Sequence, residues 1–338
     1  MSGRPSAGPE DCSYALNDFT ALMRVVRQVA PVLRRSTLPR GRLRVGAAYS
    51  LFIFSVADAI ARVMSDNDAV SPSSAAGLPR LPPLASLTRQ LLEAFAWFRF
   101  LAIQPESEDE AGFRFIVASL HAAYDEHRDA ASYADGLGEM ERSGRMETTP
   151  EEHRRQVQDV RTYQGERTRR IRRLKGEIKR CPFMAALCSK CQAYWTDRDI
   201  DLSRGFGPLR DAVFENTGLG PHIRGLEYDE LSAFVHAAPS AIMKTFEKHS
   251  RGFEFHLRYF HLWSGCLAPV VQYMVSLLPL DDRSTTVGDR KSVDECCCHY
   301  AQFLTGMQAQ SAAATGQLDP DKCPTCWLRN AAVSKADS

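Results

Sequence analysis

Residues 84–103 are apolar on most faces of a helix, and this feature limits the possible fold more than any other part of the sequence. A helix that is apolar on most sides needs neighbouring helices to cover it, because its faces would otherwise meet water. Sustained period-two alternation with flanking turn residues, the pattern typical of a sheet, is found nowhere in the sequence. The sequence therefore predicts an all-α, multi-helix bundle with this helix at its centre.

The same helical spacing recurs along much of the chain. Further helices are predicted at 45–65, 112–140, 151–180, 207–217, 227–237, 240–249 and 252–279, with a loop at 71–83 and an acidic turn at 106–110. The 338 residues are 44% hydrophobic and 25% charged, which is ordinary for a soluble protein with a substantial core. The net charge of +1 gives no overall field that would favour nucleic acid or membrane.

The first 44 residues are predicted to be a disordered, basic N-terminal arm. Residues 1–20 are polar and show no secretory signal, so the expected compartment is the cytoplasm of a bacterium. Residues 21–44 carry seven arginines and no acid, which predicts a basic amphipathic helix broken near Pro31 and Pro39. Such a helix either binds a membrane or nucleic acid, or packs its apolar side on the body, the interpretation we favour.

Two apolar runs, 45–63 and 266–280, are read as buried core helices rather than membrane spans. The first contains Asp58, and the second is only fifteen residues long and contains Pro269.

The segment 151–181 is predicted to project from a bundle domain that covers 45–290. Residues 154–180 contain eleven basic residues and three acidic ones. The apolar residues of this segment recur at helical spacing: Val157, Val160, Ile171, Leu174 and Ile178. This pattern predicts a long helix or helical hairpin with a thin apolar seam, which could pair with a protein partner or a second copy. Nucleic-acid binding is the weaker alternative, since charged runs are usually solvated faces.

A polar stripe is predicted on the helix at 227–237. Tyr228, Ser232 and His236 are spaced one turn apart among apolar neighbours, so their polar groups need partners. Arg89 and Glu93, four residues apart on the central helix, could supply those partners in one inter-helix network. The network either fixes the register of the helices or forms a ligand or catalytic pocket.

These segments carry a resemblance to a known family. The sequences Leu-Thr-Arg89-Gln-Leu-Leu-Glu93-Ala and Tyr228-x3-Ser232-x3-His236-Ala-Ala-Pro-Ser, preceded by a helix containing Ser55 and Asp58, resemble a widespread bacterial family of all-helical domains of unknown function. The resemblance covers roughly 45–280. It implies a helical bundle with a polar cluster and supplies no activity.

Two functional classes follow from the polar cluster. The leading hypothesis is a helical binding or regulatory protein. The alternative is an RNA-directed hydrolase, a toxin-like ribonuclease in which His236 is the general acid or base and Arg89 steadies a phosphate. Helical ribonuclease toxins carry an Arg-x4–6-His motif, and Arg114-x6-His121 and Arg251-x4-His256 match it, but about this many matches are expected by chance. Whether the protein is an enzyme stays open.

The last 48 residues, 291–338, are predicted to be a flexible, cysteine-bearing tail. Its thiols and one imidazole are spaced as two knuckles that could close a tetrahedral Zn²⁺ site, with the ligands Cys296, His299, Cys323 and Cys326. A zinc-stabilised interaction protein is therefore a third hypothesis. Scattered free cysteines are the simpler interpretation, and no other cofactor is predicted.

Overall fold

The computed structural model describes residues 9–35, 41–65, 81–105, 107–144, 149–186, 231–232 and 252–278. Within these ranges the chain is helical and contains no strand, which confirms the all-α, multi-helix prediction. The chain divides into two compact units, and the described helices of each are considered separately. The predicted helices at 207–217 and 240–249 lie outside the described residues.

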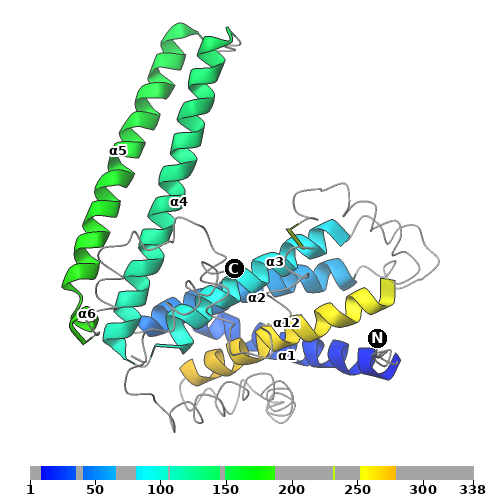
Figure 1. The fold of residues 1–338 in the computed structure, drawn as a ribbon. Helices are drawn as coiled ribbons and strands as arrows, with labels where there is room; N and C mark the ends of the chain where they lie inside the picture. The colour runs from blue at the N-terminus through cyan, green and yellow to red at the C-terminus, as the bar shows by residue number, and fades with distance from the viewer. Residues whose placement is uncertain are drawn as a thin grey trace, which may run out of the picture. The chain divides into compact units, whose positions relative to one another are not determined.

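The first unit is a bundle of four long helices that lie side by side (Figure 1). They are α1 (Pro9–Arg35), α2 (Arg42–Ser65), α3 (Leu81–Phe98) and α12 (Gly252–Leu277). The main packing contacts join α1 to α12 and α2 to α3. Trp263 of α12 is buried among the rings of Phe19, Tyr259 and Phe260. Its indole N–H donates to the Thr88 hydroxyl at 2.9 Å, so the one polar group of this side chain is satisfied inside the core.

The predicted central helix at 84–103 is present as α3 followed by one turn of π-helix, η3 (Arg99–Ile103). Its side chains are largely buried, as the sequence predicted. Arg42 at the start of α2 donates to the Ala102 carbonyl at 2.8 Å and thereby ties α2 to this turn. Burial lowers the pKa of the Arg99 guanidinium to about 10. The nearby Cys266 thiol has its pKa raised by burial, so it stays protonated and unreactive.

The N-terminal segment differs from its prediction. Helix α1 begins at Pro9, so the expected disorder of residues 1–20 is wrong from that residue on. The helix also runs through Pro31 to Arg35. Proline removes one backbone hydrogen bond of the helix, and tertiary packing compensates for this loss. That packing is extensive: one face is buried in the bundle, namely Leu22, Val25, Val26, Val29 and Leu33. The packed-helix interpretation is therefore confirmed over the described part of 21–44.

Helix α2 approaches α12 closely. A Cβ atom on Gly46 would lie 2.2 Å from the Tyr273 hydroxyl oxygen, so any larger residue would force the Tyr273 side chain to move. Among the described helices, the Arg42–Met64 stretch of α2 is long and apolar enough to cross a membrane. Core helices of soluble proteins pass the same test, and the face of α2 that carries Ile53, Ala57 and Ile60 is buried in the bundle.

The second unit is a helical hairpin formed by α4 (Glu108–Arg142) and α5 (Pro150–Arg180), with the short α6 (Pro182–Ala186) at one end (Figure 1). The predicted acidic turn at 106–110 is wrong from Glu108 on, because Ser107 caps α4 and the acids form its first turn. Acidic side chains there are stabilised by the helix dipole. Gly144 follows α4 with φ 65°, a conformation that favours glycine at a helix end.

The basic helix predicted at 151–180 is α5, and it pairs with α4 of the same chain. Thr149 and Glu152 form a reciprocal capping box at its start, and the hydrogen bonds from Thr149 lower the pKa of the Glu152 carboxyl. The seam is thin, as predicted, since Leu174 and Ile178 are its only buried aliphatic side chains on α5. The hairpin therefore depends on polar contacts as well as apolar ones.

Candidate functional site

Nine of the eleven cationic side chains of α5 fall into two groups, of which the first faces α4; the other two, Arg154 and Arg173, bond to Pro150 and Glu177 of their own helix. Glu126 of α4 binds two of them: its carboxylate lies 2.6 Å from Arg167 Nη1 and 3.1 Å from Arg170 Nη1. The Arg167 guanidinium also stacks on the Tyr163 ring at 4.3 Å, and the Lys175 ammonium lies 5.6 Å from the Tyr124 ring centroid. These inner cations hold the two helices together.

The second group forms what we call the outer face of α5. All six members are exposed, and none makes an ion pair with any residue that the structure describes: Arg155, Arg161, Arg169, Arg172, Lys179 and Arg180. Arg161, Arg169, Arg172 and Arg180 follow one another at helical spacing, so they lie along one side of the helix. With Arg154 at its start, this row spans about 39 Å at 1.5 Å per residue.

Two glycines interrupt this row. Gly165 and Gly176 are eleven residues apart, close to three helical turns, so they lie on the same side as the arginines. A Cβ on Gly165 would meet no atom within 4 Å, so packing inside the hairpin does not require glycine there. Glycine inside a helix costs about 0.5–1 kcal/mol relative to alanine. The glycines leave low points between arginine side chains, where another molecule could approach the helix backbone.

The two helices of the hairpin carry opposite charge. Helix α4 has nine acidic and three basic residues, a net charge of −6, while α5 has five acidic and eleven basic residues, a net charge of +6. The overall charge of the chain, +1, conceals this separation. An anionic partner is therefore attracted to the outer face of α5 in particular, through local charge rather than through the net charge of the protein.

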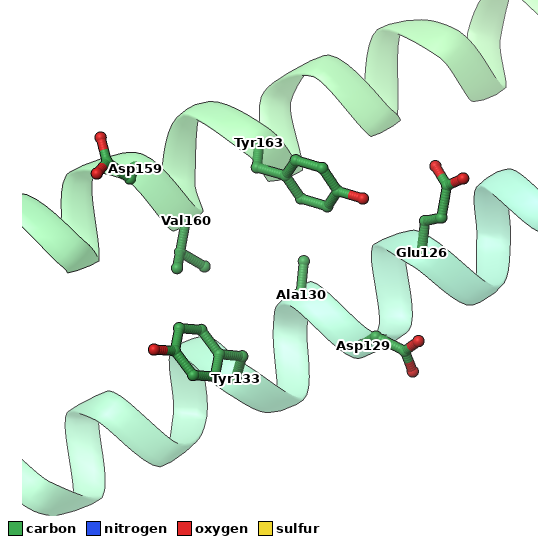
Figure 2. A pocket seen from close by; sticks show the side chains of 7 residues that line it. All are labelled: Glu126, Asp129, Ala130, Tyr133, Asp159, Val160 and Tyr163. Carbon is green, nitrogen blue, oxygen red and sulfur yellow. The ribbon is translucent and has the colours of Figure 1, made fainter.

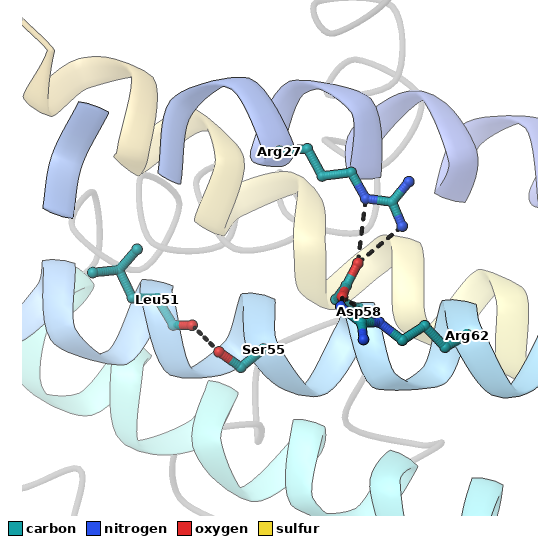
Figure 3. Close-up of polar contacts among 5 residues, drawn as sticks. All are labelled: Arg27, Leu51, Ser55, Asp58 and Arg62. Atoms are coloured by element: carbon teal, nitrogen blue, oxygen red, sulfur yellow. Dashed lines mark hydrogen bonds and ion pairs between the residues drawn. The ribbon is translucent and has the colours of Figure 1, made fainter. Parts of the chain in front are cut away.

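A second charged surface lies between α1 and α2 in the bundle. Asp58 accepts hydrogen bonds from Arg27 at 2.9 Å and from Arg62 at 2.9 Å, one arginine on each of its oxygens (Figure 3). Partial burial opposes ionisation of Asp58, but the bonds and charges of the two arginines outweigh it and lower the pKa of this carboxyl. A groove of about 550 Å³ lies beside it. Because the arginines are engaged by Asp58, this cluster serves to fasten α1 to α2.

The residues predicted from the polar stripe are only partly described. Arg89 and Glu93 form an ion pair on α3, with 2.9 Å between Nε and Oε1, and their side chains are 25% and 33% exposed. Ser232 is helical and half-buried beside the buried Leu231. Tyr228 and His236 lie outside the described residues, so the predicted network and the role of His236 as an acid or base stay predictions.

The predicted metal ligands Cys296, His299, Cys323 and Cys326 also lie outside the described residues, and zinc stays a prediction. Among the side chains that the structure does describe, no group of three or more His, Cys, Asp or Glu could hold a metal ion. The ribonuclease-like pair Arg114 and His121 falls in α4, where each binds a carboxylate of its own helix, Glu110 and Asp125 respectively.

The sequence predicts the basic helix but does not predict how its cations are divided. Glu126 determines which arginines are held, and it lies on α4, outside the basic segment. The signal was present in the sequence as the acidic excess of 108–142 directly before the basic excess of 150–180. If the two segments pair as a hairpin, the acidic side chains of α4 face only one side of α5, and the cations on the other side stay without acidic neighbours on α4.

Comparisons with known proteins give no further guide to function. No family model matches the chain, and no curated protein or solved structure is significantly similar to it. The function is therefore inferred from the geometry and charge of the described residues.

Proposed function

We propose that this protein is a non-enzymatic binding protein that holds nucleic acid by its phosphate backbone through the outer face of α5. The observation that carries the proposal is the division of cations on this helix. The two arginines facing α4 share the Glu126 carboxylate, whereas the six outer cations have no ion-pair partner among the described residues. Arg173 pairs with Glu177 four residues further along α5, as in an ordinary solvated helix, but the six outer cations make no such pair with a described residue.

The chemistry of the outer face favours phosphate over other anions. Arginine presents a planar fork of donors that matches phosphate oxygens, and five of the six outer cations are arginines. The row of about 39 Å matches the length of about eleven base pairs at ~3.4 Å each. The face offers no cluster of amide side chains that would read base edges. The expected binding is therefore insensitive to sequence and strongly dependent on salt.

The test is a salt titration with defined nucleic acids. Fluorescence anisotropy of a labelled 20-base-pair duplex and of a mixed-sequence single-stranded RNA measures binding by the full chain between low and physiological salt. The triple variant R161Q/R169Q/R172Q removes three outer cations. Its plot of log affinity against log salt should become shallower by about 2.7, since each duplex phosphate contact contributes about 0.9. The same assay with gel analysis reports any cleavage of the RNA.

The matched control is R24Q/R34Q/R44Q, which removes three exposed arginines of the bundle and changes the net charge equally. This control should bind nearly as tightly as the unmodified protein. Equal loss in both triple variants would mean that net charge, and not the outer face, governs binding. Absence of binding to either nucleic acid at low salt would reject the proposed function.

A further inference from the structure

The flank of the hairpin holds a groove of about 500 Å³ between α4 and α5, which we call the tyrosine groove. Figure 2 shows the Tyr163 ring reaching from α5 towards Ala130 of α4, with Val160 and Tyr133 facing one another across the gap. Asp129, Asp159 and Glu126 complete its lining. The groove combines aromatic walls, small aliphatic contacts and three carboxylates, and it contains no cationic lining residue.

The two helices contribute matching residues to the groove. Helix α4 supplies Asp129-Ala-x-x-Tyr133 and α5 supplies Asp159-Val-x-x-Tyr163, so each gives an aspartate, an aliphatic residue and a tyrosine at the same spacing. Because the helices run antiparallel, the two sets are related by an approximate local twofold axis. A tyrosine one turn after each aspartate lies on the same side of its helix. The match gives the groove two equivalent pairs of ring and carboxylate.

The exposure of the tyrosines indicates a surface prepared for a ligand. Tyr133 is 55% exposed and Tyr163 is 38% exposed, although aromatic rings on a hairpin gain more by packing. Neither Asp129 nor Asp159 makes an ion pair with a described residue, and both are exposed at the margins of the groove. Glu126 is occupied by Arg167 and Arg170. Two carboxylates and the Tyr133 ring therefore stay available to an incoming group.

The molecule itself shows what such a ring accepts. The guanidinium of Arg167 stacks on Tyr163 while Glu126 binds one of its nitrogens. The Tyr133 ring and the Asp159 carboxylate of the facing helix offer the same combination of ring face and carboxylate without an internal guanidinium (Figure 2). A planar guanidinium suits this combination better than an ammonium, because it can stack on the ring and donate sideways to a carboxylate at the same time.

We propose that the tyrosine groove binds an arginine side chain of a partner protein, which stacks on the Tyr133 ring and pairs with the Asp159 carboxylate at the same end of the groove (Figure 2). The partner is a basic segment, because the charge of the groove is negative and its walls are aromatic. The groove lies on the flank of the hairpin, and none of the outer cations lines it, although Arg155 is one turn before Asp159. The inference therefore does not depend on nucleic-acid binding.

The experiment uses the full chain and blocked peptides in which three arginines alternate with glycine. Isothermal titration compares this peptide with its lysine counterpart and with a neutral citrulline counterpart. The arginine peptide should bind most tightly and the citrulline peptide should not bind. Tyr133→Ala should weaken binding by about fivefold and Tyr133→Phe should leave it nearly unchanged, since the ring and not the hydroxyl is required. Equal binding of the arginine and citrulline peptides would overturn the proposal.

Charge variants separate the groove from general attraction to the acidic helix. D129N/D159N removes the two groove carboxylates and should weaken the arginine peptide by about tenfold. D135N/E151Q makes the same charge change at exposed acids outside the groove and should change affinity by less than about twofold. The assignment would be overturned if the two double variants lost affinity equally or if the lysine peptide bound as tightly as the arginine peptide. It would also be overturned if the unmodified protein did not bind the arginine peptide. Circular dichroism verifies that every variant stays helical.

Discussion

The bundle and the hairpin are both helical, yet different forces hold them together. In the bundle, broad apolar faces meet and the few buried polar groups are satisfied internally, as Trp263 and Thr88 show. In the hairpin, α5 contributes only two buried aliphatic side chains, Leu174 and Ile178, and ion pairs with Glu126 supplement them. Apolar burial is worth about 25 cal/mol per Å², so the bundle should be the more stable unit.

The same difference decides where binding surfaces can lie. Helix α3 is enclosed by its neighbours, so it presents little surface to a partner. Among the described helices, α5 packs mainly against α4, and most of the surface that it turns away from α4 is charged. A helix held by a thin seam and ion pairs keeps its outer and flanking residues available. The hairpin therefore carries both surfaces proposed for binding, while the bundle provides a stable body.

The largest effect is expected from Trp263→Ala in the bundle. Trp263 is 1% exposed and contacts three aromatic rings, so its removal leaves a cavity and takes one of the two hydrogen bonds from the Thr88 hydroxyl, which still donates to the Leu84 carbonyl. The free energy of unfolding of the bundle should fall by about 3–5 kcal/mol. Hydrogen exchange followed helix by helix should show faster exchange in the bundle and little change in α4 and α5.

Phe52→Ala is the control for this substitution. Phe52 lies on α2 and is 53% exposed, so its truncation should change stability by less than about 0.5 kcal/mol. If Trp263→Ala accelerated exchange in the hairpin as much as in the bundle, the two units would unfold together and the comparison between them would fail.

A smaller effect is expected from Glu126→Gln in the hairpin. The substitution preserves shape but removes the charge that binds Arg167 and Arg170. Opening of α4 and α5 should become easier by about 1 kcal/mol, the range for partly exposed ion pairs. Added salt should lower the opening free energy of the unmodified hairpin more than that of the variant, because only the former has these pairs to screen.

Glu166→Gln provides the comparison, since Glu166 is exposed on α5 and makes no ion pair with a described residue. It should leave the exchange of the hairpin almost unchanged. A Glu126→Gln variant that exchanged like Glu166→Gln would show that the apolar seam alone holds the hairpin, contrary to the difference described above.

Much of the fold could be predicted from the sequence because helical periodicity is local information. The apolar stretch at 84–103 and the basic helix at 151–180 were predicted nearly at their observed bounds. The predicted helix break near Pro31 is wrong, because burial of one face of α1 outweighs the backbone hydrogen bond that proline removes. The tyrosine groove could not be predicted, since it requires the pairing and register of α4 and α5. The pairing of Arg89 with Glu93 was predictable from their spacing, while their relation to Tyr228 and His236 stays a prediction.

The smallest change in stability, and the sharpest test of the outer face, comes from Gly165→Ala. A Cβ at this position meets no atom within 4 Å, so the substitution should stabilise α5 by about 0.5–1 kcal/mol. If phosphates approach the backbone between the arginines, the added methyl group should nevertheless weaken nucleic-acid binding. Gly136→Ala on α4, where a Cβ also meets open space, should bring a similar gain in stability with unchanged binding. Hydrogen exchange and anisotropy measure the two effects separately. A single methyl group affects binding only if the phosphates approach the helix backbone closely. If both variants gained stability and bound nucleic acid as before, the phosphates would contact the ends of the arginine side chains, away from the backbone.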